Sequence, residues 1–109
     1  MDRRTRTGLL LDCYGALLTN KQRAFMSQRF EEDLSLAEIA EKQGVSRQAV
    51  RDALMRGEAQ LEEYEDKLGY MERDIALARM ARELMEITAD AAVREELARL
   101  LERIEGDGV

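Results

Sequence analysis

A single glycine between two amphipathic patterns constrains the fold of this chain more than any other feature. In "DLSLAEIAEKQGVSRQAVRDAL", Gly44 separates two stretches whose apolar residues recur at helical spacing. Glycine adopts left-handed backbone angles without strain at Cβ, and Ala40, four residues earlier, is small enough for two helices to cross closely. The segment predicts a helix-turn-helix, with an ordinary helical hairpin as the alternative. The predicted scaffold of the turn consists of Ile39, Ala40, Gly44, Val45 and Val50.

Capping signals indicate where the helices begin. Thr19 and Ser35 are each followed three residues later by Gln or Glu, the spacing of a capping box. Ser46 follows the turn directly and is expected to cap the next helix, and Asp90 to cap the last one. We therefore predict helices over residues 8–17, 20–30, 36–43, 47–68 and 71–87, and a final helix after Asp90.

Two apolar seams continue beyond the helix-turn-helix at heptad-like spacing. A short chain can bury such seams against each other or against a second copy of itself. We expect the second arrangement, a homodimer. The candidate seam residues are Leu77, Met80, Leu84, Ile87, Val93, Leu97, Leu100 and Ile104.

The composition fixes the fold class and excludes several kinds of chemistry. Proline is absent, and Leu, Ala, Glu and Arg dominate, so we expect an all-α protein. Its predicted architecture is a head of three or four helices with a long recognition helix, followed by two C-terminal helices. Cys13 is the only cysteine and histidine is absent, so we expect no catalytic residue, no metal site, no cofactor and no small-molecule substrate. We expect a cytoplasmic protein without membrane insertion, because the N-terminal apolar stretch is short and interrupted by Asp12.

The net charge of −6 is unevenly distributed. Residues 1–57 contain 10 basic and 8 acidic residues, whereas residues 58–109 contain 7 basic and 15 acidic residues. An acidic surface repels phosphates, so only the first part offers a plausible nucleic-acid face. We therefore divide the chain into a helix-turn-helix part, 1–57, and an acidic helical extension, 58–109, within one compact unit.

The helix after Gly44 would be the recognition helix, whose exposed side chains contact base edges and phosphates. Arginine binds guanine through two hydrogen bonds, and glutamine binds adenine in the same way. The charge over residues 33–57 is balanced, four basic against four acidic, so a solvated mixed-charge face is the alternative. The predicted nucleic-acid-binding residues are Ser46, Arg47, Gln48, Arg51, Met55 and Arg56, with Lys21 and Arg23 from the preceding helix. For Arg3, Arg4 and Arg6 we expect a mobile terminus, with a basic arm in the minor groove as the alternative.

Three segments carry a family resemblance: "LLLDCYGALLTNKQRAF", "DLSLAEIAEKQGVSRQAV" and "LEEYEDKLGY", in this order and separation. The chain resembles the bacterial YlxM family of helix-turn-helix proteins over nearly its whole length. The resemblance implies a small, cytoplasmic, dimeric, all-helical protein with a head similar to the C-terminal domain of bacterial sigma factors. It also implies a regulatory part in the signal recognition particle pathway. Many family members have aromatic residues at Cys13 and Leu34 and a tyrosine at Arg51, so this recognition helix is more basic than the family pattern.

Three functions remain open at this stage. The first is a DNA-binding regulator associated with the signal recognition particle pathway. The second is a protein-interaction module that binds the targeting GTPase or its ribonucleoprotein without reading DNA sequence. The third is direct binding to the particle's RNA, which requires a bulge or loop because a helix does not fit the narrow major groove of A-form RNA.

Overall fold

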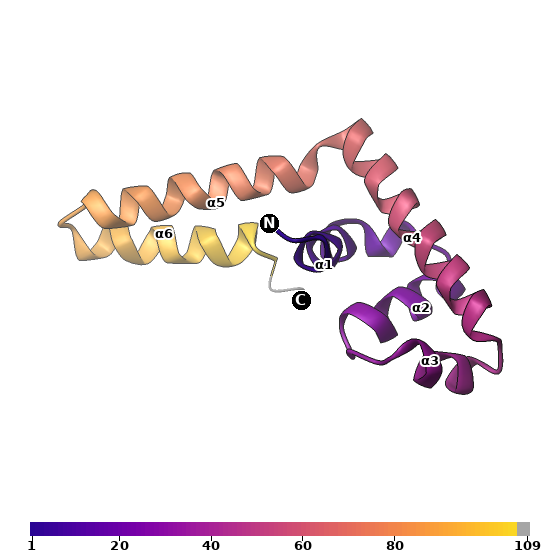
Figure 1. Cartoon of the computed structure of the whole chain (residues 1–109). Coiled ribbons are helices and arrows are strands. Elements are labelled where there is room, and N and C mark those ends of the chain that lie inside the picture. The colour runs from indigo at the N-terminus through magenta and orange to yellow at the C-terminus, as the bar shows by residue number, and fades with distance from the viewer. Residues whose placement is uncertain (107–109) are drawn as a thin grey trace. The chain divides into compact units, whose positions relative to one another are not determined.

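The computed structural model describes residues 1–106, and within them the chain is all-α. The elements are α1 (Arg3–Tyr14), a short 3₁₀ turn η1 (Gly15–Leu17), α2 (Asn20–Phe30), α3 (Leu36–Gln43), α4 (Arg47–Leu68), α5 (Tyr70–Ile87) and α6 (Ala91–Ile104) (Figure 1). The predicted fold class is thereby confirmed. Both predicted capping boxes are present: the Thr19 hydroxyl accepts from the Gln22 amide and the Ser35 hydroxyl from the Glu38 amide.

The chain forms two compact units, Met1–Leu68 and Gly69–Val109. In the N-terminal unit, α1, α2 and α3 each pack on α4. The long helix is thus the element around which this unit is built. The largest fully buried side chains of its core are Leu10, Tyr14, Met26, Ile39, Val50 and Leu61.

The boundary between the units lies at Gly69, not at the change of charge after Gly57. Gly57 is inside α4 and buried, and a Cβ placed on it would lie 2.6 Å from the Met26 sulfur. The missing side chain therefore allows α2 to cross α4 closely, and the helix continues through the glycine. Gly69 instead has φ +65°, a left-handed conformation that ends α4.

The first helix begins earlier than the apolar pattern predicted, at Arg3 instead of Gly8. The Asp2 side chain caps it by accepting from the Thr5 amide at 2.7 Å. The expectation of a mobile basic terminus is wrong, because Arg3, Arg4 and Arg6 lie in α1 and form ion pairs with Glu58, Asp33 and Glu62. The sequence signal for this start was the aspartate directly before the basic run.

In the second unit, α5 and α6 pack against each other as a helical hairpin (Figure 1). Asp90 caps α6, as predicted, by accepting from the amides of Ala92 and Val93. The side chains of Ala78 and Ala81 are buried, whereas most of the large apolar side chains of the hairpin are exposed. Among the residues that the structure describes, no helix is both long enough and apolar enough to cross a bilayer.

Candidate nucleic-acid interface

The turn between α3 and α4 has the geometry that its sequence predicts. Gly44 adopts φ +67° and ψ +35°, and its amide donates to the carbonyls of Ala40 and Glu41. The Val45 amide also donates to the Ala40 carbonyl, at 3.0 Å, so the free carbonyls at the end of α3 are satisfied by the turn itself. Ile39 and Val50 are fully buried on either side of the turn. This packing fixes the angle at which α4 leaves.

Ser46 caps α4, because its hydroxyl accepts from the Ala49 amide at 3.0 Å. The first half of α4 then presents a row of exposed side chains to solvent, and the buried side chains Val50 and Leu54 hold its other face. We call this row the recognition row. Its predicted contact residues are all exposed: Arg47, Gln48, Arg51, Met55 and Arg56. The structure therefore brings six of the eight predicted nucleic-acid residues, Ser46 included, onto one half of one helix.

The three arginines of this half-helix are among the basic residues that form no ion pair within the described part of the chain. Seven of the fourteen arginines pair with a carboxylate within the described residues, as Arg6 does with Glu62 and Arg82 with Glu105. Within residues 1–106, by contrast, no ion pair forms at Arg47, Arg51 or Arg56. Their charge is therefore available to a partner such as a phosphate.

The middle of the exposed face is less favourable to an anion. At about 100° per residue, Asp52 lies about 180° around the helix from the buried pair Val50 and Leu54. The side-chain amide of Gln48 donates to the Asp52 carboxylate at 2.9 Å. By the same count Arg51 and Arg56 are about 140° apart, so they flank this polar pair on opposite sides. A groove-binding helix commonly places cations on its flanks, where the two backbones run, and base-contacting groups between them.

Lys21 and Arg23 do not lie with the other predicted residues. A Cβ built on Gly15 would lie 3.9 Å from the Arg23 side chain, which places Arg23 at the end of α1. That end contacts the later part of α4, where Tyr64 donates to the Leu17 carbonyl. Arg47 lies at the opposite end of α4. At 1.5 Å per residue it is roughly 25 Å from Tyr64 along the helix axis.

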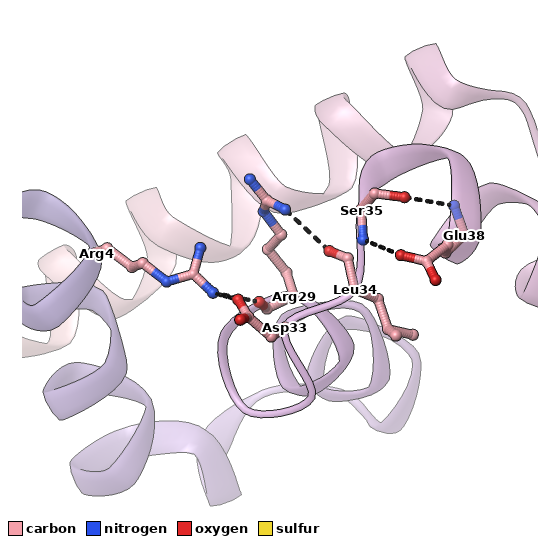
Figure 2. Close-up of polar contacts among 6 residues, drawn as sticks. All are labelled: Arg4, Arg29, Asp33, Leu34, Ser35 and Glu38. Atoms are coloured by element: carbon pink, nitrogen blue, oxygen red, sulfur yellow. Dashed lines mark hydrogen bonds and ion pairs between the residues drawn. The ribbon is translucent and has the colours of Figure 1, made fainter.

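Hydrogen bonds from Arg4 of α1 and Arg29 of α2 hold the loop between α2 and α3, and thereby position the start of α3 (Figure 2). Arg4 of α1 donates to the carboxylate of Asp33 and, at 3.3 Å, to the Arg29 carbonyl. Arg29 in turn donates to the Leu34 carbonyl at 2.9 Å. Asp33 has φ +62°, a left-handed conformation that aspartate tolerates better than most residues.

Ion pairs and a buried hydrogen bond join α1 to α4. Arg6 binds Glu62 through two hydrogen bonds, of 2.6 and 2.8 Å. These bonds lower the pKa of the Glu62 carboxyl and raise the pKa of the Arg6 guanidinium. Deeper in the interface, the Tyr14 hydroxyl donates to the Glu65 carboxylate at 2.6 Å. The second half of α4 is thus bound to α1 through Arg3–Glu58, Arg6–Glu62 and Tyr14–Glu65, a set of contacts that we call the brace.

A hollow of about 330 Å³ opens beside the recognition row. We call it the arginine groove. Its lining is formed by Arg3, Arg4, Arg29, Phe30, Leu36, Arg51, Leu54, Met55 and Glu58.

Sequence reasoning missed the arginine groove and the brace between α1 and α4. One signal was available: Glu58 and Glu62 are spaced by four, and Arg3 and Arg6 by three, so each pair lies on one helix face. Two complementary faces of this kind indicate two helices packed side by side. The groove itself had no such signal, because its walls come from four helices.

Comparison with known proteins gives a consistent result. The family model UPF0122, described as "Putative helix-turn-helix protein, YlxM / p13 like", matches residues 1–101. A UPF0122 protein of Bacillus thuringiensis (strain Al Hakam) is 45% identical over 106 residues, which is 96% of each chain. UPF0122 proteins of Bacillus cereus (strain 03BB102) and Bacillus mycoides (strain KBAB4) are 45% and 44% identical over the same share.

Proposed function

The chain belongs to the UPF0122 family of YlxM/p13-like helix-turn-helix proteins, and on that premise we propose that it is a DNA-binding regulatory protein. In this proposal the first half of α4 enters the major groove. Arg47 and Arg51 contact bases or phosphates, and Arg56 neutralises the opposite backbone. Gln48, Met55 and Ser46 complete the contact surface.

One observation carries the proposal: the first half of α4 exposes three arginines that form no ion pair within residues 1–106, although the chain has a net charge of −6. An unpaired arginine on an exposed helix loses no intramolecular partner when it binds a phosphate. Each such contact releases counterions, so the association constant for DNA should fall as the salt concentration rises. In a plot of the logarithm of this constant against the logarithm of the salt concentration, each phosphate contact should contribute a slope of about −0.9.

The decisive experiment is selection of binding sites from a random duplex pool with the full-length protein. We expect an enriched motif, and we expect Arg47→Ala with Arg51→Ala to abolish the enrichment. Arg79→Ala is the control, because Arg79 is also exposed but lies on α5 and pairs with Glu83. A pool without a motif, or a motif bound equally well by the double variant, would contradict sequence-specific DNA binding by α4.

Two further variants map the interface. Asp52→Ala removes an anion from the middle of the face and frees Gln48, so affinity for duplex DNA should rise roughly fivefold, or about 1 kcal/mol. Arg23→Ala tests the far end of the unit. Unchanged affinity would confine the interface to α4, whereas weaker binding would extend it to Lys21 and Arg23.

We also propose that two copies pair through the second unit. Six of the eight seam candidates are large side chains at least 41% exposed, and Ile87 reaches 79%. The small residues Ala78 and Ala81 are buried instead, so the hairpin leaves its largest apolar side chains in water. Burial against a second copy would gain about 25 cal/mol per Å² of apolar surface. Sedimentation should show a dimer, and Leu84→Lys should give a monomer. A wild-type monomer at micromolar concentration would remove this proposal.

The resemblance to the YlxM family supports a regulatory role associated with the signal recognition particle pathway, and a cytoplasmic location. The alternative is a protein-interaction module that binds the targeting GTPase or its ribonucleoprotein without reading DNA sequence. The carboxylate of Asp52 on the recognition face favours this alternative. Co-elution of the purified proteins, or a changed rate of GTP hydrolysis, would support it. Their absence together with a selected DNA motif would exclude it.

A further inference from the structure

The arginine groove has the chemistry of a peptide-binding site. Its apolar residues, Phe30, Leu36, Leu54 and Met55, come from three different helices. Phe30 and Leu36 are partly exposed, and Met55 is 59% exposed. Apolar surface gathered in a hollow of this size is typical of a site that receives an apolar side chain.

The charge of the groove is strongly positive. Four arginines line it and Glu58 is its only carboxylate. Three of the arginines already have partners: Arg3 binds Glu58 at 2.7 Å, Arg4 binds Asp33, and Arg29 binds a carbonyl. These contacts show that the guanidinium groups can engage carboxylates at the rim. Arg51 alone among the four has no ion pair or hydrogen bond within the described part of the chain.

We propose that the arginine groove binds an acidic segment of a protein partner. An apolar side chain of the segment sits between Phe30, Leu36 and Leu54, and one of its carboxylates pairs with Arg51. A second carboxylate reaches Arg4, whose guanidinium lies 5.9 Å from the centre of the Phe30 ring. Figure 2 shows Arg4 extending from α1 toward the loop after α2. Arg4 is also one of the residues that line the groove.

The apolar residues distinguish this occupant from a nucleic-acid backbone. Phosphates and sugars offer little apolar surface for Phe30 and Leu36 to cover, so DNA would leave this part of the groove unused. A peptide with an apolar anchor buries it and satisfies the arginines at the same time. The groove also shares Arg51 and Met55 with the recognition row. A bound segment would therefore compete with DNA for the same arginine.

The test is selection from a library of random displayed peptides on the full-length protein, followed by synthesis of the enriched peptides and measurement of binding by fluorescence anisotropy. We expect enriched sequences with a large apolar residue flanked by at least two carboxylates. Leu36→Glu and Arg51→Glu should each weaken these peptides about tenfold or more, as expected for central contacts of an interface. Leu36 is the first residue of α3, where an acidic side chain favours the helix, so Leu36→Glu should leave the fold intact.

Leu17→Glu is the matched control, because Leu17 is 55% exposed in the same unit and does not line the groove. It should leave peptide affinity unchanged. A selection that enriches nothing, or peptides without carboxylates, would overturn the proposal. Peptides that bind the Leu36→Glu variant as well as the wild type would also overturn it. So would a Leu36→Glu variant that loses duplex DNA binding while keeping peptide binding, because the groove would then serve the nucleic acid.

Discussion

Substitution of Gly57 by alanine tests the helix crossing on which the N-terminal unit depends. A Cβ at this position would lie 2.6 Å from the sulfur and 3.0 Å from Cγ of Met26. The Met26 side chain is fully buried, so it has no solvent to move into. Cγ is also close to the backbone of α2, and relief requires a shift of that helix relative to α4. The new methyl group should therefore force a rearrangement of the core.

Two opposing effects set the magnitude. Alanine is more favourable than glycine in a helix interior by about 1 kcal/mol. An extra methyl group in a well-packed core costs about 1 to 3 kcal/mol. We therefore expect Gly57→Ala to change the free energy of unfolding by between about 0 and −2 kcal/mol. Gly8→Ala isolates the first effect, because Gly8 is within α1 and a Cβ there meets nothing within 4 Å. Gly8→Ala should stabilise the protein by up to about 1 kcal/mol.

The assay is urea unfolding followed by far-UV circular dichroism, with amide hydrogen exchange at Leu61 as a report on the N-terminal unit alone. The two glycine variants should differ by about 1 to 3 kcal/mol, which is the cost of overpacking. In a double-mutant cycle, Met26→Ala should relieve the cost of Gly57→Ala. If Gly57→Ala stabilised the protein as much as Gly8→Ala does, the argument for a close crossing would be refuted.

Three further predictions concern the turn and the brace. A methyl group at position 44 would meet open space, but φ there is +67°, which strains any residue with a Cβ. Gly44→Ala should therefore lower the free energy of unfolding in urea by about 1 to 2 kcal/mol. A neutral result would mean that the turn can change its backbone angles. The hydrogen bonds from Arg6 lower the pKa of the Glu62 carboxyl in the folded protein. At pH values above the unfolded pKa near 4.3, the pair should therefore add about 0.5 to 1 kcal/mol to the free energy of unfolding. This contribution should be lost as the pH falls through the folded pKa. The stability difference between wild type and Glu62→Gln, followed from neutral to acid pH, should shrink accordingly, and a constant difference would exclude the ion pair as its source. Tyr14→Phe removes the donor to buried Glu65 and should cost about 1 to 3 kcal/mol in thermal unfolding. A loss below that range would show that Glu65 is satisfied without the tyrosine.

Local signals in the sequence were sufficient for most helix boundaries. The capping boxes at Thr19 and Ser35, and the glycines at 44 and 69, act within one turn of the chain, so their effect does not depend on what packs nearby. The recognition row followed from the same register, because once α4 begins after Ser46, helical periodicity decides which residues are exposed.

The chain by itself thus determined that the protein is helical, where α3 turns into α4, and which side chains the first half of α4 presents. Only the tertiary structure decided that Arg3, Arg4 and Arg6 are paired, that Gly57 is a crossing point and that Arg23 lies far from Arg47. The physical reason is range. Capping and periodicity act between residues a few positions apart, whereas an ion pair between α1 and α4, or a groove walled by four helices, exists only after residues far apart in the chain have packed together.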